Sequence, residues 1–94
     1  MLKHIVAWKI QEENKAENMR KMKEMLELLV GKIDVIKSMQ VGFNENGGKY
    51  DVVLVTDFSD KHDHELYDNH PEHQAVRKFI RSICVERESI DYNY

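Results

Sequence analysis

Apolar and polar positions along the chain follow the periods of strands and helices. In residues 3–10, KHIVAWKI, apolar side chains stand at both odd and even positions, which indicates a strand with apolar groups on both faces. Residues 50–58, YDVVLVTDF, share this property, whereas Met39, Val41 and Phe43 alternate with polar or small residues. We therefore predict two central strands and, around Val41, a strand at a sheet edge.

The segment between the first two strands has the features of an amphipathic helix. Asn14 and Glu17 are spaced as in a capping box, in which the Asn side chain accepts from a free backbone N–H group. Gly31 is typical of the position just beyond a helix end. Apolar residues recur between them at helical spacing, at Met19, Met22, Met25, Leu26 and Leu29.

A helix in two parts is expected in the second half of the chain. Ser59 and Asp60 can cap a first segment that ends near Asp68. Pro71 suits the first turn of a second segment and disfavours helix at His70, which predicts a break just before the proline. The second segment carries an apolar stripe of Ala75, Val76, Phe79, Ile80 and Ile83.

These elements follow the order β-α-β-β-α-β. NENGG, residues 44–48, supplies the Asn and Gly that a hairpin turn needs for positive φ, and VERESIDYNY, residues 85–94, predicts a final, mostly polar strand. Right-handed crossovers then give a ferredoxin-like α+β fold with a four-stranded antiparallel sheet, in one domain over residues 1–94. That topology places the first and third strands in the centre, in agreement with their apolar faces.

Two helices can cover only one face of such a sheet. Apolar residues of the central strands, namely Ile5, Ala7, Val53 and Val55 or their neighbours on the opposite face, are then left in water. Burying each larger side chain is worth ~1.5 kcal/mol or more, in a domain whose net stability is about 5 to 10 kcal/mol. We therefore predict a homodimer in which two sheets pack face to face as an α+β barrel.

Composition narrows the functional classes. The formal charge of −3 over 94 residues and the scattered Lys and Arg residues offer no basic stripe for nucleic acid. No apolar stretch is long enough to span a membrane, and the N-terminal residues lack the pattern of a signal peptide, so we expect a cytoplasmic protein. Cys84 is the only cysteine, which excludes an internal disulfide and is typical of a small buried apolar residue.

The candidate chemistry gathers around YDNHPEHQAV, residues 67–76. His73 follows the helix start at Pro71, where its imidazole can turn back toward Tyr67 and toward His4 on the first strand. A histidine that titrates near neutral pH can take and return a proton, as enolisation and aldol chemistry require. The alternative is structural, because His70 and His73 can instead hydrogen-bond free backbone groups at the helix start.

Other histidines and arginines give weaker patterns. His62 and His64 are two residues apart and cannot share one ion from one helix, and no set of ligands has standard spacing, so we expect no metal and no cofactor. Arg77 and Arg81 are one helical turn apart and complement the helix dipole, with anion binding as the alternative.

Four segments of the chain together resemble the stress-responsive α/β-barrel domain family, abbreviated Dabb. They are LKHIVAWKI, YDVVLVTDF, YDNHPEHQAV and ESIDY, which cover nearly the whole chain. The aromatic-x-x-His-Pro-x-His element is the most specific of these features, together with a histidine in the first strand. The resemblance implies a ferredoxin-like protomer and a homodimer whose two sheets form a barrel.

The resemblance also suggests roles for three residues. A plant polyketide cyclase of that family closes its substrate by intramolecular aldol condensation, and its pocket residues correspond here to His4, Tyr67 and His73. A further pocket tyrosine falls near Leu26 and a histidine near Val52, both apolar in this chain. The basic centre is thus retained, whereas the means of substrate recognition differ.

Three functions remain open at this stage, and the sequence does not decide whether the protein is an enzyme. The first is a pocket between sheet and helices that binds a small apolar or aromatic carbonyl compound, with His73 as general base, Tyr67 orienting the substrate or stabilising an enolate, and His4 assisting. The second is a noncatalytic stress or interaction protein. The third is a cofactor-free monooxygenase, which shares the dimeric architecture.

Overall fold

Four strands and three α-helices make up the fold, which the computed structural model describes over residues 1–94. The predicted ferredoxin-like order is confirmed, with the second helix divided in two and a short 3-10 helix, η1, after the first. The elements are β1 (Leu2–Ile10), α1 (Lys15–Leu28), η1 (Leu29–Gly31), β2 (Ser38–Phe43), β3 (Val52–Phe58), α2 (Lys61–Asp68), α3 (Pro71–Ile83) and β4 (Cys84–Asn93).

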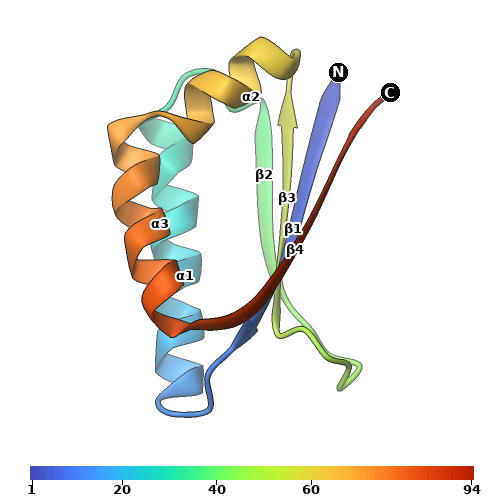
Figure 1. The fold of residues 1–94 in the computed structure, drawn as a ribbon. Coiled ribbons are helices and arrows are strands. Elements are labelled where there is room, and N and C mark those ends of the chain that lie inside the picture. The colour runs from blue at the N-terminus through green and yellow to red at the C-terminus, as the bar shows by residue number, and fades with distance from the viewer.

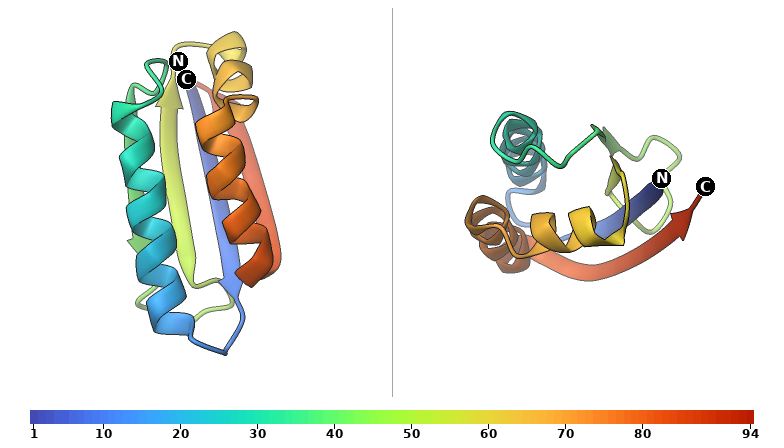
Figure 2. Two further views of the ribbon diagram at one scale, coloured as in Figure 1. Left: turned by 90° about the vertical axis from the view of Figure 1, so that its left-hand side faces the viewer. Right: turned by 90° about the horizontal axis from the view of Figure 1, so that it is seen from above.

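The sheet is antiparallel throughout, with the strand order β2-β3-β1-β4. Strands β1 and β3 are central and β2 is an edge strand, as predicted. Helices α1 and α3 lie side by side along one face, and α2 crosses above one end of the sheet (Figures 1 and 2). The helix-facing side chains of β1, among them Val6, Trp8 and Ile10, are buried in a core shared with the helices.

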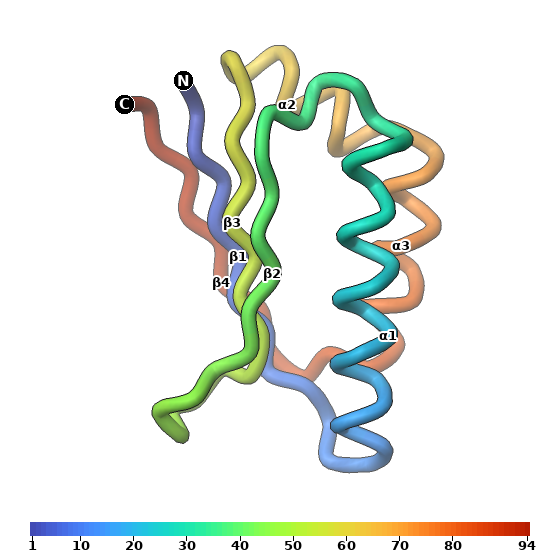
Figure 3. Tube along the Cα trace, turned by 180° about the vertical axis from the view of Figure 1, so that it is seen from behind, coloured from blue at the N-terminus to red at the C-terminus, as the bar shows by residue number.

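The opposite face of the sheet carries the predicted apolar patch. Both long helices lie on one side of the sheet, so nothing in the chain covers this face (Figure 3). Ile5 is paired with Val55 on one side and Ile90 on the other, and Ala7 is paired with Val53. Val53 is 36% exposed and Ile90 66% exposed. We call these five residues the rear patch.

Helix α1 begins directly after Asn14, as predicted, but the predicted caps at its two ends are wrong. Asn14 precedes the helix in a left-handed conformation with φ of 55°, and its side chain makes no capping hydrogen bond. A side-chain cap needs extended backbone at that position, whereas here only the Asn14 carbonyl is used, by the Asn18 N–H. Gly31 does not adopt positive φ, because the chain tightens into η1, where the Leu29 carbonyl accepts from Lys32 and Ile33.

The connection between β2 and β3 is longer than the predicted tight turn. It spans residues 44–51 and is held by side-chain turns, in which Asn44 accepts from the Asn46 N–H and Asn46 accepts from the Gly48 N–H. Gly47 has the positive φ, 72°, that the sequence indicated. The antiparallel pairing is confirmed, but the loop projects beyond the sheet (Figure 3).

The start of each later helix follows its sequence signal. Asp60 accepts from the Asp63 N–H at the start of α2, and His70 Nδ1 accepts from the Glu72 N–H at the start of α3, with Pro71 in its first turn. Val76, Ile80 and Ile83 are buried as predicted, whereas Ala75 is exposed and lies outside the stripe. His73 is therefore the third residue of the new helix α3, and its side chain is buried.

Candidate functional site

A cavity of about 270 Å³ lies between the sheet and the helices α2 and α3. Its wall is apolar over Val6, Trp8, Leu26, Leu54 and Ile80. Phe79 and the methionines are large enough to fill this space, but none of them lines the cavity. The cavity therefore remains open. Its volume lies just below the usual range for drug-sized ligands, which suits a small molecule.

The three candidate residues from the sequence meet at this cavity. His4 comes from β1, Tyr67 from α2 and His73 from α3, and all three are buried. The Tyr67 and His73 rings are tilted by 33° with centroids 4.1 Å apart, and the centroids of His4 and Tyr67 are 6.4 Å apart. Their convergence agrees with the sequence hypothesis, while their catalytic roles stay a prediction. His70 lies outside the cavity and serves the helix start.

The tautomer of His73 follows from its hydrogen bond. His73 Nδ1 lies 3.1 Å from the backbone carbonyl oxygen of Asp68, and a carbonyl can only accept, so Nδ1 carries the proton. In the neutral ring, Nε2 then has a free lone pair and can accept a proton. Burial lowers the pKa of His73 below its ordinary value of 6.5, and the Asp68 carbonyl only partly offsets this. The ring is therefore held neutral, as a base, around pH 7.

Tyr67 presents an unsatisfied hydroxyl group. Its side chain is fully buried and its Oη has no hydrogen-bond partner within the protein. A buried polar group without a partner costs roughly 1 to 3 kcal/mol, so a ligand oxygen that pairs with it gains that free energy back. Burial raises the pKa of Tyr67 well above its ordinary value of 10, which keeps the phenol protonated and able to donate.

His4 is oriented by a carboxylate that the sequence hypothesis lacked. Asp91 on β4 stands directly opposite His4 in the strand register, and its Oδ1 accepts from His4 Nδ1 at 2.5 Å. This bond fixes the tautomer and leaves His4 Nε2 without a proton in the neutral ring. Burial lowers the pKa of His4, and the Asp91 hydrogen bond opposes that shift.

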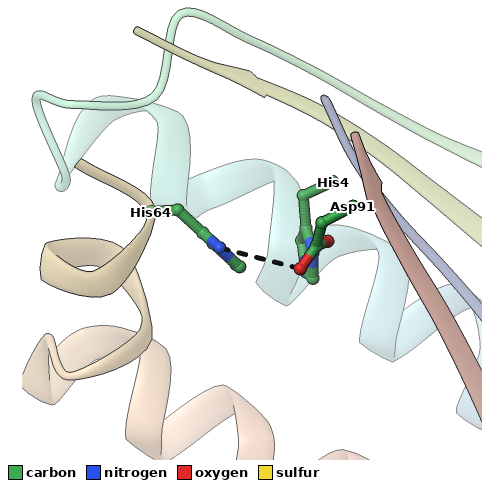
Figure 4. Close-up of side chains that lie close together, drawn as sticks. All are labelled: His4, His64 and Asp91. Atoms are coloured by element: carbon green, nitrogen blue, oxygen red, sulfur yellow. Dashed lines mark hydrogen bonds and ion pairs between the residues drawn. The ribbon is translucent and has the colours of Figure 1, made fainter. Parts of the chain in front are cut away.

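His64 on α2 completes the polar end of the cavity. Its ring lies 4.3 Å from that of His4, and its Nε2 is buried without a hydrogen-bond partner. Figure 4 shows the His64 imidazole directed toward Asp91, whose Oδ2 lies 4.0 Å from His64 Nδ1. We call His4, His64, Tyr67, Asp68, His73 and Asp91 the polar end.

Two of these residues were missed from the sequence, for different reasons. His64 stands three residues before Tyr67 and so shares its helix face, a signal that the pairing of His64 with His62 concealed. His62 is in fact exposed, on the outer face of α2. Asp91 shares one face of β4 with Ser89 and Arg87, which the sequence shows by their spacing of two residues. Only the strand register reveals that Asp91 stands opposite His4.

The residues that could hold a metal ion are His4, His64 and Asp91. They offer one ligand atom each, all within 4.8 Å of one another, which is the donor set of a two-histidine, one-carboxylate site. However, His4 Nδ1 and Asp91 Oδ1 are 2.5 Å apart, a separation that fits a shared proton. An ion bonded to both atoms at about 2.1 Å needs them farther apart. The geometry fits the acid–base arrangement better than a metal centre.

None of the helices has the length and apolar character required to cross a lipid bilayer.

Cys84 is one of the residues that line the cavity. Burial raises the pKa of its thiol, which disfavours the reactive thiolate.

Comparisons with known proteins identify a family that matches the sequence and solved structures that share the fold. Residues 2–94 match the family described as the stress responsive A/B barrel domain, or Dabb. A dimeric protein of unknown function with a ferredoxin-like fold from Bacteroides fragilis is 35% identical, with a TM-score of 0.93 over 99% of this chain and 95% of that one. Among curated proteins, none matches the sequence significantly.

Two more distant structures share the fold alone. A hydroxynitrile lyase from Passiflora edulis is 12% identical, with a TM-score of 0.86 over 97% of this chain and 90% of that one. A candidate antibiotic biosynthesis monooxygenase from Nitrosomonas europaea is 13% identical, with a TM-score of 0.82 over 100% of this chain and 98% of that one.

Proposed function

The chain belongs to the stress responsive A/B barrel domain family, and from this premise we propose that it is a homodimeric pocket protein that transfers protons on a small apolar or aromatic carbonyl compound. The observation that carries the proposal is the convergence of two neutral histidines and an unsatisfied tyrosine hydroxyl on one open cavity. A solid core would have filled that space, and a purely structural role for the histidines does not account for it.

The proposed chemistry is enolisation of a bound carbonyl compound. His73 Nε2 removes a proton from the carbon next to the carbonyl group, and the C–H electron pair moves to the carbonyl oxygen to form an enolate. Tyr67 donates a hydrogen bond to that oxygen, which bears more charge in the transition state than in the ketone. The enolate carbon then regains the proton from His73, or it attacks a second carbonyl carbon, whose C=O electron pair moves to oxygen and takes the proton from His73 to give the hydroxyl group of an aldol product.

His4 and Asp91 assist from the opposite wall. The Asp91 carboxylate holds His4 in the tautomer whose Nε2 can accept a hydrogen bond or a proton, and it stabilises the imidazolium once that forms. His64 Nε2 and Asp68 lie at the same end, where a substrate hydroxyl can meet them.

The homodimer is part of this proposal. The rear patch is apolar, continuous across three strands and uncovered by the chain itself, and the Bacteroides fragilis relative, at 35% identity, is dimeric. Packing two such faces together removes them from water and leaves each cavity on the outer, helix side of its own sheet. The monooxygenase structure resembles this chain in its fold only, so the resemblance gives no support to a reaction with oxygen.

Acetophenone in D₂O provides the test, because its methyl protons exchange slowly without a catalyst and its size suits the cavity. We expect the protein to accelerate that exchange, followed by proton NMR, with saturation as acetophenone concentration rises. Saturable binding without exchange supports the noncatalytic alternative. Absence of both binding and exchange, across acetophenone and other aryl ketones, contradicts the proposal.

A further inference from the structure

Three arginines line the same cavity as the polar end and have no acidic partner. Arg77 and Arg81 come from α3 and Arg87 from β4. The ion pairs of the protein involve lysines and histidines, and none involves any of these three guanidinium groups. The only hydrogen bond that the Arg87 side chain makes is a long one, 3.5 Å, to the Ser89 hydroxyl. We call Arg81 and Arg87 the basic end, because Arg77 lies only one helical turn from His73.

The helix and the strand set the distance between the two ends. His73, Arg77 and Arg81 follow one another at intervals of four residues on α3, so Arg81 stands two turns, about 12 Å along the axis, from His73. On β4, Arg87 and Asp91 are four residues apart on one face, about 13 Å. Helix α3 therefore runs from the polar end to the basic end, and β4 returns from the basic end to the polar end.

Charge is separated along this axis. The carboxylates of the cavity, Asp68 and Asp91, lie among the histidines at the polar end, where Asp91 is bonded to His4. The guanidinium groups at the other end have five donors each and no carboxylate to accept from them. Trp8 stands at the basic end, directly opposite Arg87 in the strand register, and Val6 lies between Trp8 and His4 on the same strand face.

We propose that the ligand of this cavity is an aromatic or apolar carbonyl compound that also carries a carboxylate, bound with the carboxylate at Arg81 and Arg87 and the carbonyl group at His73. This inference rests on the proposed function and specifies its substrate class. A planar carboxylate accepts two parallel hydrogen bonds from one guanidinium group, which binds and orients it at once. Val6 and the Trp8 ring, which line the cavity wall between His4 and Arg87, provide the apolar surface for the body of the ligand.

A matched pair of ligands tests the inference, 4-acetylbenzoate and 4-acetylbenzamide. They share the acetyl group whose methyl exchange reports on His73, and they differ in the charge at the opposite end. We expect the carboxylate to bind at least about tenfold more tightly than the amide, as one charge-assisted hydrogen bond predicts. Added NaCl is expected to weaken binding of the carboxylate and to leave the amide nearly unaffected.

Substitution locates the effect. Arg81→Gln and Arg87→Gln are expected to reduce the affinity for 4-acetylbenzoate toward that for 4-acetylbenzamide, measured by isothermal titration calorimetry. Both arginines are exposed, so the variants should fold, which their circular dichroism checks. Arg20→Gln is the control, because Arg20 is exposed on α1 and does not line the cavity.

The outcomes separate this inference from the function on which it rests. Equal affinity for the two compounds, with exchange in both, overturns the carboxylate subsite and leaves the proposed enolisation intact. Preferred binding of 4-acetylbenzoate that depends on Arg81 or Arg87, without methyl exchange, supports the subsite and contradicts the chemistry. A preference that survives both substitutions overturns the placement at the basic end, and failure of both compounds to bind overturns the two proposals together.

Discussion

His73→Gln is expected to slow the protein-dependent exchange of acetophenone methyl protons at least about 100-fold, the lower end of what a positioned general base contributes. Glutamine has a similar length and can donate its amide N–H to the Asp68 carbonyl, as His73 Nδ1 does, but it cannot accept and return a proton at Nε2. The comparison therefore removes the base while preserving the hydrogen bond at the helix break. Exchange rates by proton NMR measure the effect.

His70→Gln is the matched control for this variant. His70 belongs to the same helix start, but it lies outside the cavity and caps the first turn of α3. Its replacement should leave the exchange rate within a few-fold of that of the unmodified protein. Comparable rates in the two variants, with both folded by circular dichroism, would contradict a catalytic role for His73.

The pH profile follows from the direction of the His73 shift. The base is the neutral ring, and burial lowers its pKa below 6.5, so the neutral form persists to lower pH than in an exposed histidine. The exchange rate should therefore hold steady as pH falls through 6.5 and decline only below it, as the lowered pKa is reached. A decline centred above 6.5 would point to a different group.

Val55→Asp is expected to convert the homodimer into a monomer. Val55 belongs to the rear patch and is paired with Ile5 on β1 and Gln40 on β2, so a carboxylate there would be buried in an apolar interface. Burying an unpaired charge costs several kcal/mol, more than a small interface can tolerate. Light scattering after size exclusion measures the mass against 11.2 kDa per chain.

Leu66→Asp serves as the control for dimerisation. Leu66 is 47% exposed on α2, on the side of the sheet away from the rear patch. Its substitution likewise replaces an apolar side chain by a carboxylate. This variant should keep the mass of two chains. A single-chain mass for the unmodified protein at micromolar concentration would remove the basis for the homodimer.

The fold was predictable because its main features follow from local patterns of apolar, polar and helix-breaking residues. Strands β1 and β3 carry apolar residues on both faces and are central for that reason, and Pro71 marks the break that directs α3. Loop and cap details were not predictable to the same degree. Asn14 looks like a side-chain cap, yet its backbone is left-handed and its side chain makes no capping hydrogen bond.

The site was predictable in its histidines and tyrosine but not in its charge arrangement. His4, Tyr67 and His73 belong to segments with recognisable patterns. Asp91 acquires its role only through a pairing across 87 residues of sequence, and the same register places Arg87 opposite Trp8, where it lines the cavity together with the arginines of α3. Such long-range pairings depend on the packed sheet, which no local period specifies.

Imidazole nitrogen NMR during titration with 4-acetylbenzoate tests the central claim that the polar end is a ligand-binding acid–base site. The five histidines provide internal controls, since His4, His64 and His73 line the cavity whereas His62 and His70 do not. We predict saturable shifts for the three cavity histidines, with His4 and His73 protonated at Nδ1 before ligand is added, and no comparable change at the other two. Binding that leaves all three cavity signals in place would show that this cavity is not the site.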